Sequence, residues 1–396
     1  MQHARRNISL LIIAQLIFVS GSVITVTFGG IVGAKLAPTA NLATLPVSLM
    51  VLGTAIGTLP ASWLMNLFGR QIGFIGAALV ASFSLWLAAD SIAQTRFWQY
   101  CIATSLIGVC LAFSAQLRFA AAESVDLSRA GLAISLILAG SIGGAIVGPE
   151  LITQGSAVNE DGFIGALLLA AVLFLIGAAV LLFLKLPRPS DQVAVNSVMA
   201  SRSVLGLLQS PQFLLAVISG TVGYGVMTYL MTATPVSMHV IDGHSMEDTA
   251  AVIRAHVLGM YVPSLFSGYL ITRYGERNII GWGVAIYVIT IAIALTGQAV
   301  MHYTAALILL GLGWNFMFVG GTTLLIKTYQ PEERFKAQAI NEAAVFGTSA
   351  VGSLLAGALL SQFGWTLVVI STVPALLLVT VLMVLTPTHS VGTQKS

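Results

Sequence analysis

One ten-residue pattern occurs twice in this chain, as SWLMNLFGRQ over residues 62–71 and as GYLITRYGER over residues 268–277. A second pair of segments follows the first, DLSRAGLA over residues 126–133 and PEERFKAQ over residues 331–338, at nearly the same separation. Matching segments at one constant separation indicate an internal duplication. The 396-residue chain is therefore expected to consist of two similar halves.

The composition predicts that both halves lie in a membrane. Hydrophobic residues make up 57% of the chain and charged residues only 8%, whereas roughly a quarter of the residues in a soluble domain are charged. A helix needs about 20 apolar residues to cross the hydrocarbon of a bilayer. The sequence contains twelve such runs and is therefore predicted to be an all-α integral membrane protein. The runs cover residues 8–30, 42–64, 72–92, 97–117, 131–153, 162–186, 211–235, 253–272, 278–298, 302–326, 338–361 and 365–386.

The runs form two groups of six, which predict an N-terminal bundle over residues 1–186 and a C-terminal bundle over residues 211–396. Residues 187–210 are more polar and contain Pro187 and Pro189, so they are expected to link the bundles. A cleaved signal peptide is a less suitable interpretation of the first run. The run is too long, and no small-residue cleavage site follows it.

Basic residues predict the orientation, because short cytoplasmic loops of membrane proteins carry an excess of Lys and Arg. With both termini in the cytoplasm, fourteen of the 17 basic residues lie in inward segments, and Lys35, Arg96 and Arg254 lie outside. The expected location is the bacterial inner membrane. The excess of basic residues follows from this topology and does not imply a nucleic-acid partner.

The duplicated loop resembles the G-x-L-x-D-x-x-G-R motif that follows the second helix in the major facilitator superfamily, and the resemblance extends over the whole chain. It implies two six-helix bundles related by pseudo-twofold symmetry, and transport of a small solute by alternating access. Three positions depart from the motif, since Ser62 replaces a glycine, Asn66 an aspartate and Gln71 a basic residue.

In the superfamily this loop is a cytoplasmic gate, so the resemblance implies gating roles for Asn66, Gly69, Arg70, Arg129, Gly275, Arg277 and Arg334. Arg70 is expected to act at a helix end or with Glu123 or Asp126. The alternative is that Arg70 and Arg129 only anchor the protein through the excess of positive charge inside.

Within the fifth run, the segment from Gly140 to Pro149 resembles the glycine-proline motif of proton-driven antiporters. The match is partial, because Ile152 and Thr153 stand where that motif ends in glycines, and Thr104 replaces an arginine of the fourth helix. The same spacing of small residues also occurs where helices simply pack closely. Efflux of a drug or metabolite by proton antiport is therefore kept as the alternative function.

Polar and small residues follow one face of the first, fourth, seventh and tenth runs, which are expected to line a central pathway because lipid-facing helices do not tolerate them. The predicted substrate-binding residues are Gln15, Gln116, Tyr224, Trp314 and Asn315. The alternative for all of them is helix-to-helix packing and hydrogen bonding, which is favoured for the isolated Ser and Thr residues.

Two carboxylates within the runs, Glu150 and Glu342, are the candidates for coupling transport to protons, since burial raises the pKa of such groups. Arg118 and Glu123 lie near the inner end of the fourth run, so both are expected to extend to the membrane interface.

Several classes of function are disfavoured. The loop from His239 to Asp248 matches no metal-ligand spacing, and the chain has no Walker A sequence and no nucleophile-base pair. No metal, cofactor or enzymatic activity is expected, and the protein is expected to act as a monomer with a small-molecule substrate. A channel or scaffold is the other class, although two matching halves suit two alternating gates better.

The stretches Gln116–Glu123 and Gly311–Gly321 resemble those of bacterial facilitator proteins that include riboflavin importers. The resemblance implies uptake of a flat, conjugated solute, for which Trp314 and Tyr224 would supply stacking surfaces.

Overall fold

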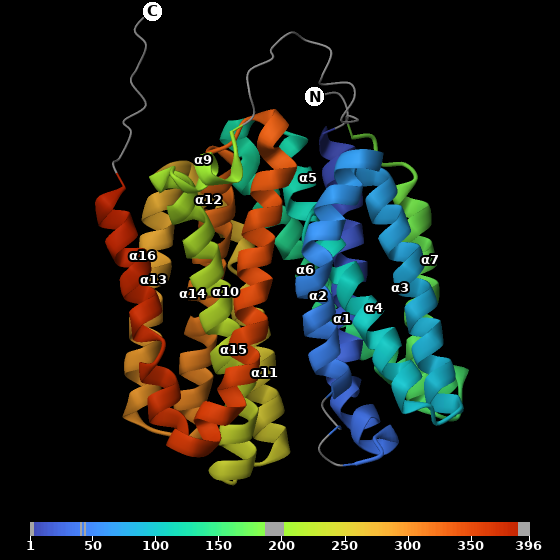
Figure 1. The fold of residues 1–396 in the computed structure, drawn as a ribbon. Coiled ribbons are helices and arrows are strands. Elements are labelled where there is room, and N and C mark those ends of the chain that lie inside the picture. The colour runs from blue at the N-terminus through green and yellow to red at the C-terminus, as the bar shows by residue number, and fades with distance from the viewer. Residues whose placement is uncertain (1–3, 40–41, 43–44, 187–201, 387–396) are drawn as a thin grey trace, which may run out of the picture.

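Helices form all the regular structure in the residues that the computed structural model describes, namely 4–39, 42, 45–186 and 202–386. They make two bundles that stand side by side, one from each half of the chain (Figure 1). The described chain begins and ends on the same side of the molecule. We call this side the terminal face and the other side the opposite face.

The helices follow the apolar runs of the sequence. The first bundle contains α1 (Ala4–Leu36), α2 (Leu45–Phe68), α3 (Arg70–Ala93), α4 (Phe97–Ser114), α5 (Leu117–Glu123), the 3-10 turn η2 (Leu127–Arg129), α6 (Ala130–Val158) and α7 (Gly162–Leu181). The second contains α9 (Val204–Leu208), α10 (Pro211–Pro235), the π-helical turn η3 (Val236–Ile241), α11 (Met246–Tyr261), α12 (Ser264–Tyr274), α13 (Glu276–Thr296), α14 (Val300–Ile326), the 3-10 turn η4 (Pro331–Glu333), α15 (Arg334–Ile370) and α16 (Val373–Leu385).

Eleven helical segments of the described chain are long and apolar enough to cross a membrane. The remaining predicted run, 253–272, corresponds to α11 and α12, which are separated at Val262 and Pro263. Proline has no backbone N–H and interrupts a helix. The predicted all-α membrane fold of two bundles is confirmed, but its eighth helix is broken into two. Residues 187–201 of the predicted linker lie outside the described residues, so the bundle boundaries stay a prediction.

The matching glycines of the duplicated loop adopt nearly the same backbone conformation. Gly69 has φ 85° and ψ 157°, and Gly275 has φ 82° and ψ 151°. This conformation is essentially restricted to glycine. Each of the two residues lies between one helix and the next, Gly69 between α2 and α3 and Gly275 between α12 and α13. The duplication of sequence is therefore also a duplication of local structure.

The bundles contact each other through α2 with α15 and through α6 with α12. Ser135 of α6 and Ser267 of α12 share a hydrogen bond of 2.9 Å between their hydroxyl oxygens. A Cβ on Gly268 would lie 2.6 Å from the Cα of Leu132. Small residues at such positions let two helix backbones approach closely within a membrane, so this glycine is required for the contact between α6 and α12.

The glycines that resemble the antiporter motif pack against α1. A Cβ on Gly140 would lie 2.9 Å from the carbonyl oxygen of Ile12, and one on Gly144 would lie 2.7 Å from that of Leu16. Close packing of α6 on α1 is sufficient to require small residues there. The motif therefore gives no separate support for proton antiport.

We expect Gly69→Leu and Gly275→Leu each to abolish most solute uptake, because a side chain in this backbone conformation costs about 1–3 kcal/mol and the turn must change to relieve it. Gly76→Leu in α3 is the matched control, since a Cβ there meets no atom within 4 Å. Uptake by reconstituted vesicles and thermal unfolding of the purified proteins are the measurements. Uptake by Gly69→Leu equal to that of the control would show that the turn is only a connector.

Candidate functional site

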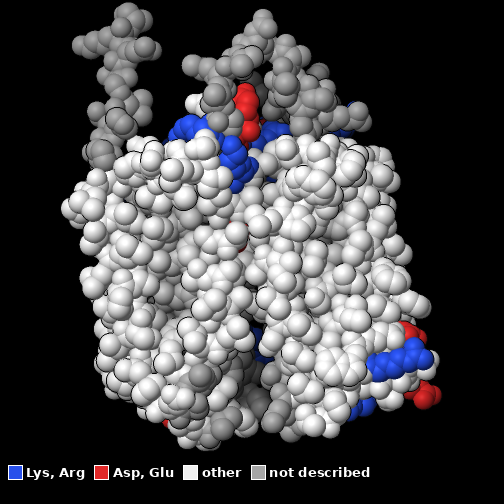
Figure 2. Space-filling view, in the orientation of Figure 1, with Lys and Arg blue, Asp and Glu red and all other residues white. Residues whose placement is uncertain are grey.

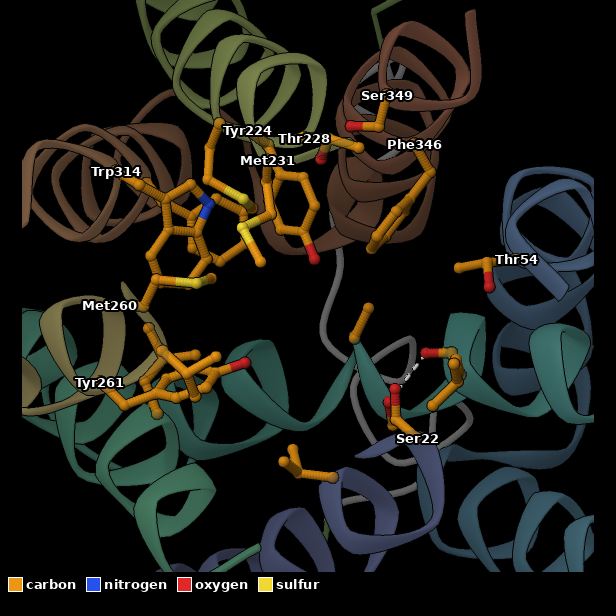
Figure 3. A pocket seen from close by; sticks show the side chains of 18 of the residues that line it. Ser22, Thr54, Tyr224, Thr228, Met231, Met260, Tyr261, Trp314, Phe346 and Ser349 are labelled. Atoms are coloured by element: carbon orange, nitrogen blue, oxygen red, sulfur yellow. Dashed lines mark hydrogen bonds between the residues drawn. The ribbon is translucent and has the colours of Figure 1, made fainter. Parts of the chain in front are cut away.

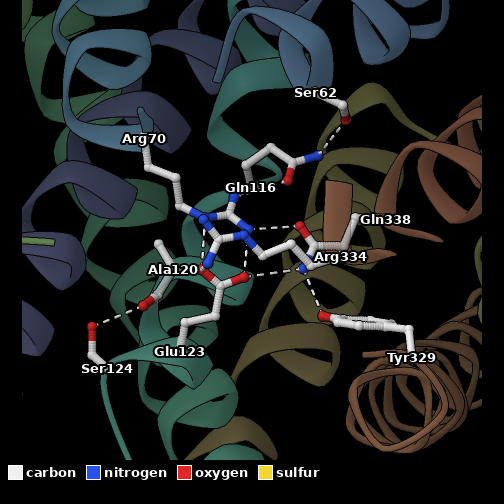
Figure 4. Close-up of polar contacts among 9 residues, drawn as sticks. All are labelled: Ser62, Arg70, Gln116, Ala120, Glu123, Ser124, Tyr329, Arg334 and Gln338. Carbon is white, nitrogen blue, oxygen red and sulfur yellow. Dashed lines mark hydrogen bonds and ion pairs between the residues drawn. The ribbon is translucent and has the colours of Figure 1, made fainter. Parts of the chain in front are cut away.

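Charged and amide side chains from both bundles meet near the terminal face (Figure 4). We call this group the terminal-face cluster; it consists of Arg70, Gln116, Glu123, Tyr329, Arg334 and Gln338. Arg70 is buried and donates two hydrogen bonds to Glu123, from Nε to Oε2 at 2.9 Å and from Nη2 to Oε1 at 2.6 Å. Such bidentate pairing is the strong geometry between arginine and carboxylate.

The second bundle completes the terminal-face cluster. Arg70 Nη2 also donates to Gln338 Oε1 at 2.6 Å, and Gln338 Nε2 donates to Glu123 Oε1 at 3.2 Å and to the Tyr329 hydroxyl at 2.6 Å. Arg334 Nη1 lies 3.7 Å from Glu123 Oε2. Arg70, Gln116 and Glu123 come from the first bundle, and Tyr329, Arg334 and Gln338 come from the second. The cluster therefore joins the two bundles at the terminal face.

A second pair of charges joins the bundles at the wall of the central cavity. Arg118 of α5 donates from Nη2 to Oε1 of Glu342 of α15, and the two side chains are 5% and 0% exposed. Asn341 Nδ2 donates to the same oxygen at 2.8 Å. The expectation that Arg118 extends to the membrane interface is wrong, because the other bundle supplies a carboxylate in the interior, and a buried charge needs such a partner.

A cavity of about 590 Å³ lies between the bundles, within the range of about 300–1,000 Å³ that is usual for small-molecule sites. Residues of α1, α2, α4, α5, α6, α10, α11, α14 and α15 line it. Figure 2 shows the bundles in contact toward the terminal face and a hollow between them toward the opposite face. The terminal-face cluster thus closes one side of the molecule, and the cavity faces the other.

The second bundle gives the cavity an aromatic wall (Figure 3). This wall consists of Tyr224, Tyr261, Trp314, Phe318 and Phe346. Trp314 and Phe318 are stacked, with ring centres 5.0 Å apart and planes 17° apart. The Tyr224 ring centre lies 5.6 Å from that of Trp314 in an edge-to-face contact. The indole N–H of Trp314 is buried and has no hydrogen-bond partner among the described residues.

The first bundle gives the cavity five polar side chains, which lie among apolar ones such as Val19 and Met50. We call these five the polar wall; they are Gln15, Ser22, Thr54, Ser114 and Arg118. Gln15 Nε2 donates to the Ser141 hydroxyl at 2.9 Å. A flat apolar ring system fits the aromatic wall, and hydroxyl or carbonyl groups on the same molecule fit the polar wall.

Of the predicted substrate-binding residues, Gln15, Tyr224 and Trp314 line the cavity. The structure places the other two elsewhere. Gln116 accepts a hydrogen bond of 3.1 Å from Arg70 within the terminal-face cluster, and Asn315 Nδ2 donates 2.8 Å to the carbonyl oxygen of Met260. Asn315 therefore ties α14 to α11 and does not extend into the cavity, and Gln116 supports the cluster.

The predicted gating residues separate into distinct positions. Arg70 and Arg334 belong to the terminal-face cluster, and Gly69 and Gly275 form the two turns. Asn66 and Arg129 are exposed. Arg129 and Arg334 occupy matching positions of the duplicated segments, and of this pair Arg334 is the one that approaches Glu123.

Arg277 and its counterpart Gln71 both cap helix ends. Arg277 donates to the backbone carbonyls of Thr386 and Met383, where α16 ends. Gln71 Nε2 donates to the carbonyls of Leu181 and Leu182, where α7 ends, at 3.2 and 2.9 Å. The last carbonyls of a helix have no partner within the helix. The contacts of Arg277 therefore lie within its own bundle and support a capping role.

The position just before Gln71 and Arg277 carries charges of opposite sign in the two copies, Arg70 and Glu276. Arg70 pairs with Glu123 in the first bundle, whereas Glu276 pairs with Lys327 at 2.8 Å in the second. The first pair extends across to the other bundle through Gln338, and the second pair joins α13 to the end of α14. The two copies of the loop are therefore alike in backbone but different in their ion pairs.

The two predicted coupling carboxylates lie in different surroundings. Glu150 is exposed and accepts a hydrogen bond of 2.9 Å from Gln154, whereas Glu342 is fully buried beside Arg118. Protonation of a carboxylate is tuned by burial and by neighbouring charge, so burial favours Glu342; coupling by either residue stays a prediction. Within the described ranges, no group of three or more His, Cys, Asp or Glu side chains could hold a metal ion.

The comparison with known proteins agrees with this geometry. A sequence profile of the Major Facilitator Superfamily matches residues 10–252 and again residues 243–396, and the chain belongs to this superfamily of transporters. It is 39% identical to the riboflavin transporter of Brucella anthropi over 388 residues, which are 97% of each chain. It is 25% identical to an uncharacterized transporter of the superfamily from Bacillus subtilis, over 96% of this chain and 90% of that one.

Two solved structures share the fold at low sequence identity. The fucose:proton symporter of E. coli superposes with a TM-score of 0.71 at 14% identity, over 96% of this chain and 98% of the symporter. A bacterial homologue of the iron transporter ferroportin, in its outward-facing state, gives 0.69 at 15% identity, over 95% of this chain and 98% of that one. Both similarities concern the fold alone.

The pairing of Arg118 with Glu342 was missed in the sequence, because 224 residues separate the partners. A signal for it was present. Each is a charged residue inside a long apolar run, and such charges within a bilayer are costly unless they find a partner of opposite sign.

Glu123→Gln should weaken closure of the terminal face, because it leaves Arg70 and Arg334 without their carboxylate. Hydrogen bonds to charged groups contribute about 1.5–3 kcal/mol each, which is comparable to the few kcal/mol that separate conformations in many proteins. We expect spin labels on the exposed residues Ser128 and Glu332, one in each half of the chain, to show one short distance in the wild type and an added longer one in the variant.

Asp126→Asn is the control for this measurement, because Asp126 is an exposed carboxylate three positions from Glu123. It should leave the distance distribution as in the wild type. A Glu123→Gln protein with the wild-type distribution would contradict a closing role for the cluster.

Proposed function

We propose that this transporter imports riboflavin across the bacterial inner membrane by alternating access. The observation that carries the proposal is the division of the central cavity into an aromatic wall and a polar wall. Riboflavin has the same division, since it joins a flat isoalloxazine ring system to a chain of hydroxyl groups. Its ring system would lie against Trp314 and Tyr224, and its hydroxyl groups would meet Gln15, Ser22 and Thr54.

The name of the Brucella anthropi relative supports the same solute, because that protein is 39% identical over nearly the full length of both chains. In the proposed cycle riboflavin enters from the opposite face while the terminal-face cluster is closed. The cluster then separates, and the cavity opens toward the terminal face. Efflux of a drug or metabolite would use the same cycle in reverse, and the direction of flux in vesicles distinguishes the two.

We further propose that the terminal face is cytoplasmic, on the basis of the fourteen basic residues assigned to inward segments. Reporter fusions after residues 200 and 395 should both behave as cytoplasmic, giving a fluorescent protein that matures and an alkaline phosphatase that stays inactive. An active phosphatase after residue 395 would place the C-terminus in the periplasm and contradict the orientation.

Substitution of Trp314 tests the aromatic wall. Trp314→Ala should weaken riboflavin binding by about 1–3 kcal/mol of lost stacking, and Trp314→Phe should give an intermediate value because it keeps a ring. Trp282→Ala is the matched control, since Trp282 is 41% exposed on α13 and lies outside the cavity lining. Binding is measured by quenching of flavin fluorescence, and transport by counterflow in vesicles.

Two results would count against this assignment. Wild-type protein that neither binds nor moves riboflavin would exclude the solute, although the chain would still be a transporter. Loss of thermal stability in parallel with binding in both Trp314 variants would show that this residue only fills space between helices.

A further inference from the structure

The charge of the cavity comes from a single residue. Arg118 is the one charged side chain among the described residues that line it. Its guanidinium carbon lies 4.1 Å from the centre of the Phe318 ring, which in turn stacks on Trp314. The cation therefore adjoins the aromatic wall. A lone cation in surroundings of low dielectric would attract anions strongly.

Glu342 neutralises the charge of Arg118 although its own side chain does not line the cavity. Its Oε1 accepts the hydrogen bond from Arg118 Nη2, and the carboxylate is fully buried. Glu342 is not among the lining residues, so it reaches a solute through Arg118 and not by contact. The other charges that meet between the bundles are the buried Arg70 and Arg334 and the partly buried Glu123, and they belong to the terminal-face cluster.

We propose that Glu342 sets the charge selectivity of the transporter: by neutralising Arg118 it makes the cavity accept uncharged flavins and reject phosphorylated ones such as riboflavin 5′-phosphate. This inference rests on the proposed function, because riboflavin is its reference solute. A phosphate group must give up hydration to enter the cavity, and a neutral ion pair offers it no net charge in return. Riboflavin loses less hydration energy on entry, because its hydroxyl groups can form hydrogen bonds with the polar wall.

The ion pair is not held by a complete hydrogen-bond network. Arg118 Nε and Glu342 Oε2 are both buried without a hydrogen-bond partner among the described residues. Arg118 is therefore bound mainly by the one carboxylate and can turn toward the cavity when that carboxylate loses its charge. Removal of the negative charge should thus create an anion site, and not only damage the existing one.

The test compares binding of riboflavin and riboflavin 5′-phosphate to purified protein without any ion gradient, by flavin fluorescence quenching. Wild type should bind riboflavin at least about tenfold more tightly than the phosphate. Glu342→Gln should improve binding of the phosphate relative to riboflavin by about tenfold, because a freed guanidinium forms charge-assisted hydrogen bonds with it.

Three further variants separate charge from shape. Glu342→Asp keeps the negative charge and should keep the wild-type preference. The double variant Arg118→Gln with Glu342→Gln removes both charges and should lose the gain for the phosphate. Glu160→Gln removes an exposed carboxylate outside the cavity and should leave the ratio of the two affinities unchanged.

A Glu342→Gln protein with the wild-type ratio would overturn the inference, and so would a wild type that binds both flavins equally. Absence of riboflavin binding by the wild type would overturn the proposed function instead. If Glu342→Gln does not fold, the wild-type ratio together with that of the double variant and Glu342→Asp still decides the matter. In that case loss of the preference in Glu342→Asp would contradict the proposal.

Discussion

Buried charges shared between the two bundles are the constraint on which the rest of this transporter depends. Arg70 with Glu123 and Gln338, and Arg118 with Glu342, hold the bundles together toward the terminal face. Removing one partner of a buried pair typically costs several kcal/mol. The terminal face can therefore open only when these groups find water or other partners, which makes opening a discrete step. These pairs do not join the bundles toward the opposite face, where a hollow lies between them.

The two halves share one local backbone structure but differ in the contacts of their side chains. Gly69 and Gly275 keep one backbone conformation, and Gln71 and Arg277 keep one capping role at the ends of α7 and α16. The residue just before each of them carries a positive charge in the first copy and a negative charge in the second. In the first copy this residue also bonds to Gln338 of the other bundle. The cavity is also asymmetric, because all five residues of its aromatic wall come from the second bundle, whereas Gln15 and Arg118 come from the first.

Much of this architecture was predictable because it follows from local chemistry. Apolar length located the helices, and the repeated glycine located the two turns. Gln15, Tyr224 and Trp314 were identified as cavity residues because they lie on polar helix faces, and polar groups are costly where a helix faces lipid. Contacts between distant segments were not predictable in this way. Gln116 and Asn315 have the same polar character, yet they bond to Arg70 and Met260, and nothing in their own helices distinguishes a side chain that faces the cavity from one that faces a neighbouring helix.

The most direct test of the account is a cryo-electron microscopy structure of the full chain in lipid nanodiscs with saturating riboflavin. It should show flavin density between the aromatic wall and the polar wall, with the isoalloxazine against Trp314 and Tyr224 and with Arg118 still paired to Glu342. An empty cavity, or a flavin bound with its ring system on the polar wall, would contradict the account.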